Sequence, residues 1–194
     1  MIRGLFSLAL LLVIGGAGAA YFAAQAQPQV SRDLPAVPAS TEAAAAFDDK
    51  VLSVQAALEA AKTTGVAQPI SLEFTDAELT SKATIVVGSL TGGFIPTDPQ
   101  IHVQPGNIVL TANLSLAGFT QKLAVTAIPV LVDGKPAFSI DQVETALPLP
   151  DGIKKEINAQ IAKILSPQSL GFAFEITKIE AHQGRLVFEG SAKP

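Results

Sequence analysis

The chain has 194 residues, of which 48% are hydrophobic and 15% are charged, and its formal net charge is −4. This length predicts one domain with additional segments, and the acidic balance gives no indication of a nucleic-acid partner. The chain has no cysteine, which excludes disulfides, thiolate catalysis, cysteine metal sites and a cysteine-linked lipoprotein anchor.

An uncharged apolar segment occupies residues 4–24. About 20 apolar residues are enough to cross a bilayer as a helix, so we expect residues 1–26 to be a retained transmembrane anchor. Tyr21 and Phe22 favour the anchor because they continue the apolar run to its end. The alternative is a cleaved signal peptide, since Ala-Gln-Ala at residues 24–26 fits a cleavage site. Both interpretations place the following chain on the extracytoplasmic side of the cell membrane, and cleavage would release it as a secreted protein.

Residues 27–40 contain three prolines and little periodicity. This composition predicts an extended linker that serves as a spacer. The remainder, residues 41–194, is expected to form one α+β domain, with its core at residues 69–190.

The stretch at residues 41–65 has strong helix propensity. Ser40 or Thr41 can cap its start, and Gly65 can end it. One apolar stripe runs along this helix, at Phe47, Val51, Val54 and Leu58. The stripe is too short to argue for a coiled coil, so the helix is expected to lie on its own domain.

A strand and a short helix are predicted next. The strand is indicated by alternating apolar residues at Ile70, Leu72 and Phe74. Thr75 and Glu78 then form a capping box, which starts a helix at Asp76. We expect this helix to be short and residues 85–87 to lie beyond its end.

From residue 101 the apolar period changes to two. Three alternating runs are bounded by turn signals at residues 104–107, 117–120 and 133–134, the last of which is Asp-Gly. The pattern predicts an antiparallel meander with one apolar face. Pro129 cannot donate a ladder hydrogen bond, so its strand is expected to be an edge there or to carry a bulge.

A long amphipathic helix is predicted after the meander, beginning at Pro150 and Asp151. Its stripe consists of isoleucines at Ile153, Ile157, Ile161 and Ile164. Two strands joined by a turn at residues 182–185 close the chain. The elements together predict helices on one face of a single antiparallel sheet, built from the meander and the C-terminal hairpin.

Signals for chemistry are sparse. His102 and His182 have no partner at metal-ligand spacing, so we interpret both as ordinary surface or turn residues. Neither a nucleophile elbow nor a phosphate-binding loop occurs. We therefore expect no enzyme activity, no cofactor and no metal. A hydrolase using Asp141 and Glu144 is the enzymatic alternative, although nothing in the pattern favours it.

The remaining signal is a surplus of one-sided apolar surface, which either closes into a core or leaves a groove for acyl chains. A groove needs little polar chemistry, because burying each CH₂ contributes about 0.8 kcal/mol. The candidate groove residues are Leu110, Leu114, Leu116, Leu123, Val125, Phe138, Ile140, Ile153, Ile157, Ile161, Ile164, Phe172, Phe174, Leu186 and Phe188.

The order of these patterns resembles a known family. The chain has an N-terminal anchor and linker, "FTDAEL" at residues 74–79, an alternating segment at residues 101–118, "LPDGIKKEINAQIAKIL" at residues 149–165 and a final hairpin at residues 176–190. This arrangement is similar to bacterial proteins of the tubular lipid-binding (TULIP-like) group, which includes the YceB-like lipoproteins and the mycobacterial LmeA-like envelope proteins.

The resemblance implies a strongly curved antiparallel sheet that cradles a long helix, with a hydrophobic groove between them. It also implies non-catalytic binding of phospholipid or glycolipid in the cell envelope. The alternative is an envelope module that uses a closed domain to contact another protein. The alanine-rich helix at residues 41–62 has no clear counterpart in the family pattern, so the groove is either open or plugged by that helix.

Overall fold

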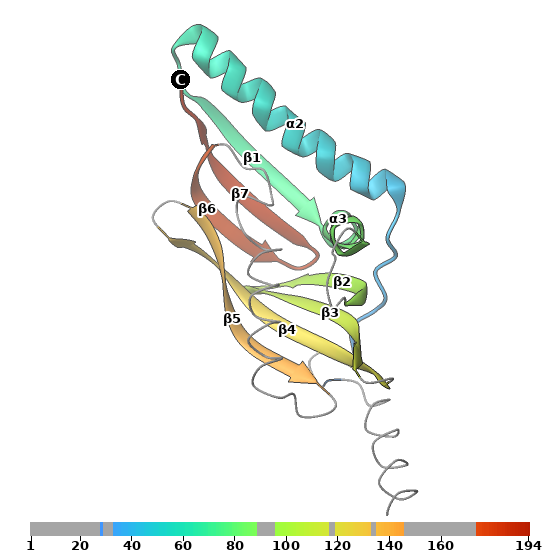
Figure 1. Cartoon of the computed structure of the whole chain (residues 1–194). Coiled ribbons are helices and arrows are strands. Elements are labelled where there is room, and N and C mark those ends of the chain that lie inside the picture. Colours follow the sequence, from blue (N-terminus) through green and yellow to red (C-terminus); the bar gives the residue numbers. More distant parts are fainter. Residues whose placement is uncertain (1–27, 29–32, 89–95, 117–118, 133–134, 146–173) are drawn as a thin grey trace, which may run out of the picture.

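In a computed structural model, the described residues are 28, 33–88, 96–116, 119–132, 135–145 and 174–194 (Figure 1). These residues form an α+β fold with two helices, α2 (Thr41–Thr64) and α3 (Asp76–Gly88). A three-stranded antiparallel sheet has the order β1 (Gln68–Thr75), β7 (Arg185–Ala192), β6 (Glu175–His182). A four-stranded antiparallel sheet has the order β2 (Thr97–Gln104), β3 (Asn107–Leu116), β4 (Phe119–Val132), β5 (Lys135–Thr145).

The expectation of a single sheet is wrong, because the meander and the C-terminal hairpin belong to different sheets. The first strand, β1, pairs with β7 along its whole length, from Gln68 opposite Ala192 to Thr75 opposite Arg185. This pairing draws the C-terminal hairpin to the N-terminal strand instead of to the meander. An alternating apolar pattern specifies a face but not a neighbour, so the sequence pattern does not distinguish these pairings.

Two expected helices fall outside the described residues. These are the N-terminal segment at residues 1–26 and the amphipathic helix that begins at Pro150. Within the described ranges, neither α2 nor α3 combines the length and apolar character needed to cross a membrane.

Helix α2 is confirmed, with the expected signals at both ends. The Ser40 side chain accepts a hydrogen bond from the Ala43 N–H at 3.0 Å, which satisfies one of the free donors of the first turn. Gly65 ends the helix in the left-handed conformation, with φ of 68°, and its N–H donates to the Ala61 carbonyl. Phe47 and Val54 are buried, so the helix packs on its own domain as expected.

The capping box at the start of α3 is also confirmed. The Thr75 N–H donates to Glu78 Oε2 at 2.8 Å, and the Glu78 N–H donates to Thr75 Oγ1 at 3.3 Å. The helix continues to Gly88, so the expectation that residues 85–87 leave it is wrong. Val87 is buried, and this tertiary contact outweighs the low helix propensity of the β-branched run.

The meander is confirmed as four consecutive antiparallel strands. Pro129 lies opposite Phe138 of β5, whereas the pairing between β3 and β4 begins only at Ile108 and Ala127. Pro129 therefore occupies a part of β4 that has no β3 residue beside it, so β4 is an edge strand there, as expected. A register shift between Thr126 and Ala127 adds the irregularity that the sequence also allowed.

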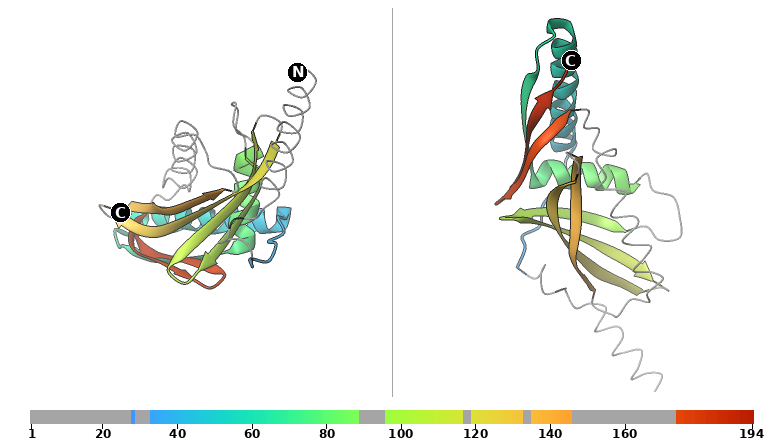
Figure 2. Two further views of the ribbon diagram at one scale, coloured as in Figure 1. Left: turned by 90° about the horizontal axis from the view of Figure 1, so that it is seen from below. Right: turned by 90° about the vertical axis from the view of Figure 1, so that its left-hand side faces the viewer.

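One hydrophobic core joins α2, α3, the three-stranded sheet and the near ends of β2 and β3. In Figure 1, α2 runs alongside β1, and the second view of Figure 2 shows α3 between the two sheets. Three phenylalanines stack through this core. The Phe47 and Phe74 rings lie 4.6 Å apart, and the Phe74 and Phe188 rings lie 5.9 Å apart, edge to face.

Gly190 provides a test of the three-stranded sheet. A Cβ atom at this position would overlap the Glu175 carbonyl oxygen of the neighbouring strand β6. We expect Gly190→Ala to lower the free energy of unfolding by about 1–3 kcal/mol, since a backbone atom cannot rotate away. Chemical denaturation measures the change. The control is Gly88→Ala, which meets open space at the end of α3 and is expected to be neutral or up to about 1 kcal/mol stabilising. Equal stability of the two variants would contradict the register of β6 and β7.

Candidate functional site

The apolar face of the four-stranded sheet is the candidate ligand surface. Strand register places Leu110 opposite Val125, and Val125 opposite Val143, so these side chains share one face. The same face carries apolar or small residues on all four strands, at Ile101, Val103, Ile108, Ala112, Leu114, Leu123, Ala127, Phe138 and Ile140.

The candidate groove residues divide into three sets. The first set belongs to or packs against the core under α2 and contains Leu110, Phe138, Phe174, Leu186 and Phe188. The second set lies on the four-stranded sheet outside that core cluster and contains the buried Leu114, Leu123 and Val125 with the half-buried Ile140. The third set lies outside the described residues, or has no described side chain, and contains Leu116, Ile153, Ile157, Ile161, Ile164 and Phe172.

The first set is already covered by protein side chains. Phe188 is 1% exposed and contacts Phe74, which in turn stacks on Phe47 of α2. Leu186 is buried in the same cluster. A ligand at Leu186 or Phe188 would have to displace α2. These two residues therefore serve the closed part of the domain. Leu114, Leu123 and Val125 are equally buried, at 1–3% exposed, but they lie outside that cluster and remain the candidates for ligand contact.

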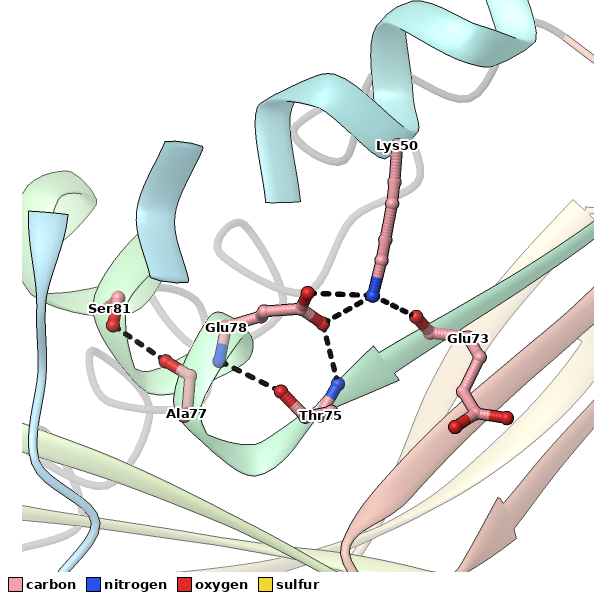
Figure 3. Close-up of polar contacts among 6 residues, drawn as sticks. All are labelled: Lys50, Glu73, Thr75, Ala77, Glu78 and Ser81. Carbon is pink, nitrogen blue, oxygen red and sulfur yellow. Dashed lines mark hydrogen bonds and ion pairs between the residues drawn. The ribbon is translucent and has the colours of Figure 1, made fainter. Parts of the chain in front are cut away.

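Two lysines hold α2 on this core. Lys50 Nζ donates to both Glu78 carboxylate oxygens, at 2.6 and 2.7 Å, and to the Glu73 carbonyl at 2.6 Å (Figure 3). The Glu78 side chain is only 9% exposed, and it also satisfies the Thr75 N–H. In a second ion pair the cation lies on α3 and the anion on α2: Lys82 Nζ lies 2.6 Å from Asp48 Oδ1. The two pairs fix α2 against both α3 and β1.

The outward edge of β2 is closed by α3 and by the turn between β6 and β7. Thr80 Oγ1 accepts from the Ile101 N–H at 2.9 Å and donates to the Ile101 carbonyl at 3.4 Å. Asp76 Oδ1 accepts from the Val103 N–H at 2.8 Å. The Gly184 N–H donates to the Val103 carbonyl at 2.8 Å. Four backbone groups that a free edge would leave open thus have partners.

The half-buried Asp76 and the buried His102 lie near each other beside this edge. Burial raises the pKa of Asp76, while the Val103 N–H and nearby His102 act in the opposite direction. Burial lowers the pKa of His102, and nearby Asp76 opposes that change. Desolvation thus favours the neutral form of each group over the charged form.

The two histidines differ in their surroundings. His182 lies in the β6–β7 hairpin with its side chain half exposed, 3.4 Å from Glu180, as expected for a turn residue. His102 is 4% exposed, so its interpretation as a surface residue is wrong. It occupies the second face of the four-stranded sheet, where it lies opposite Val109 and where Thr111 and Thr126 are also buried. Alternation alone predicted one buried face, but this sheet buries side chains on both.

The polar residues of this junction were not singled out from the sequence as a set. The sequence pattern predicts only a capping role for Glu78 and only a helix start at Asp76. A usable signal was Lys50, a cation placed between Phe47 and Val54 along the apolar stripe of α2. In the described part of the chain, His, Asp and Glu side chains form no cluster of three or more that could hold a metal ion. No protein-family model and no curated protein sequence matches the chain.

Lys50 is expected to stabilise the fold more than an exposed lysine does. Lys50→Met leaves the nearly buried Glu78 carboxylate without its cation, so we expect a loss of about 2–3 kcal/mol in the free energy of unfolding. Lys62→Met removes an exposed pair with Glu59 and should cost at most about 0.5 kcal/mol. Urea denaturation of both variants measures the difference. If Lys50→Met loses no more stability than Lys62→Met, the Lys50–Glu78 ion pair does not hold α2 on the core.

His102 is expected to make stability depend on pH. Because its pKa is lowered in the fold, the unfolded chain binds more protons between that lowered value and about 6.5. The contribution of His102 is therefore present above about pH 6.5 and is lost as the pH falls through this window. We expect His102→Gln to lose less stability than the unmodified chain between about pH 7 and pH 5. Denaturation at a series of pH values tests this, and parallel curves would contradict it.

Proposed function

We propose that the protein is a membrane-anchored envelope protein that binds the acyl chains of a phospholipid or glycolipid, without catalysis, against the apolar face of the four-stranded sheet. The observation that carries the proposal is the extent of that face. The core under α2 uses Ile108 and Leu110, whereas Leu114, Leu123 and Val125 continue the same face outside that cluster. The anchor at residues 1–26 and the isoleucine stripe that begins at Ile153 remain predictions from the sequence.

The chemistry of the face suits hydrocarbon. Beyond the core it carries the aliphatic Leu114, Leu123 and Val125, with the polar Gln121 and Thr145 beside Leu114 and Leu123. A bound chain would gain about 0.8 kcal/mol for each CH₂ removed from water. The charged residues described above lie elsewhere, between α2 and α3 or at the edge of β2. A ligand held in this way is selected by the length and shape of its chain more than by its headgroup.

Lipid extraction from the purified full-length chain tests the proposal directly. The chain is isolated in a mild detergent, native mass spectrometry records bound masses, and organic solvent extracts the ligand. A released species in the phospholipid range supports lipid binding. An unliganded mass that persists after incubation with envelope lipids would favour the alternative, a closed module that contacts another protein.

A variant with a larger side chain on the apolar face of the four-stranded sheet tests where the lipid lies. Ala112 is 3% exposed and lies opposite Leu123. Ala112→Leu adds three carbons to this position and should exclude a similar number of ligand methylenes, which weakens binding by roughly 2 kcal/mol, or about 30-fold. Titration of the full-length chain with a fluorescent phospholipid measures the affinity.

Ala83→Leu is the matched control, because Ala83 belongs to the core under α2. This variant should cost about 1–3 kcal/mol of stability through overpacking while the folded chain retains its lipid affinity. If Ala112→Leu instead shows the same loss of stability and no change in lipid affinity, Ala112 lies in a closed core and the ligand surface is placed wrongly.

A further inference from the structure

The linker that precedes α2 is hydrogen-bonded to the folded domain at two backbone amides. The Val37 N–H donates to Gln100 Oε1 of β2 at 3.3 Å. The Ser40 N–H donates to Ser81 Oγ of α3 at 3.0 Å. Both bonds span large sequence separations and are partly buried. A spacer that only connects two parts of a chain would leave such amides to water.

The acceptors belong to the junction that closes the edge of β2. Ser81 is 2% exposed, and its hydroxyl donates to the Ala77 carbonyl at 2.6 Å, which leaves an oxygen lone pair oriented for Ser40. Gln100 lies next to Ile101, whose backbone groups bond Thr80. In Figure 1 the segment runs from the start of α2 past α3 to the four-stranded sheet.

The composition of the segment lowers the cost of holding it in place. Leu34 and Val37 are half-buried, so the segment contributes apolar contacts in addition to its two amide bonds. Pro35 and Pro38 restrict the backbone to extended conformations, which reduces the entropy lost on docking.

We propose that residues 33–40 form a strap, docked on β2 and α3, that fixes the domain relative to the chain preceding it. Release of the strap would add eight residues to the tether, with a fully extended length of at most about 26 Å. This inference does not depend on lipid binding, because it rests on contacts outside the proposed ligand face.

Hydrogen exchange in the full-length chain tests the docked state. We expect the Val37 and Ser40 amides to be protected in the unmodified chain. Gln100→Ala should speed exchange at Val37 by up to about tenfold, as expected for the loss of one hydrogen bond. Gln104→Ala is the matched control, since this glutamine of the same strand has no described hydrogen bond to the strap.

Spin labels provide a second readout, and the absence of native cysteine makes labelling specific. Labels at Ala36→Cys and Asp49→Cys should give a narrow distance distribution that broadens in Gln100→Ala. Val37→Pro removes the donor without altering the sheet and should broaden it too. Unprotected amides in the unmodified chain, or a broad distribution before any further substitution, would overturn the strap.

Discussion

The backbone edge of β2 is the constraint on which the other contacts depend. An edge strand presents N–H and C=O groups that must bond to water or to protein, and a free edge invites another strand. Here a hydroxyl of α3, a carboxylate of α3 and an amide of the β6–β7 turn take those positions. The four-stranded sheet therefore ends at β2, and the C-terminal hairpin is fixed beside it without becoming part of it.

The first turns of α3 provide hydrogen-bond partners for the β2 edge and hold α2 at the same time. In an α-helix, residues four apart lie on one face, whereas residues two apart lie on nearly opposite faces. Asp76 and Thr80 therefore both reach β2, while Glu78 points away from that edge and toward Lys50 of α2. The capping box sets the helix start, and a shift of one residue would remove all three contacts together. The capping box, a local sequence signal, thus determines how α2, α3 and the four-stranded sheet meet.

Local signals could be predicted from the sequence, whereas contacts between distant elements could not. Patterns that act within one element, such as the Thr75 and Glu78 capping box or the Gly65 helix end, appear in the structure as expected. The pairing of β1 with β7 was missed because an alternating strand fits any neighbour of suitable length. For the same reason, alternation could not separate Phe188, which lies under α2, from Leu123 on the other sheet, and it gave no indication that His102 is buried.

The division of the apolar residues between two sheets determines what ligand binding would cost the fold. The core under α2 contains three stacked phenylalanines and is held by the Lys50 and Lys82 ion pairs, all from described protein side chains. It needs no ligand to be complete. The aliphatic residues at Leu114, Leu123 and Val125 lie outside that cluster, so occupancy of their face would act on β3 and β4 while leaving the α2 core intact. Under the proposed function, an acyl chain would exchange at these residues without disturbing the stacked phenylalanines, because none of the three belongs to the cluster under α2.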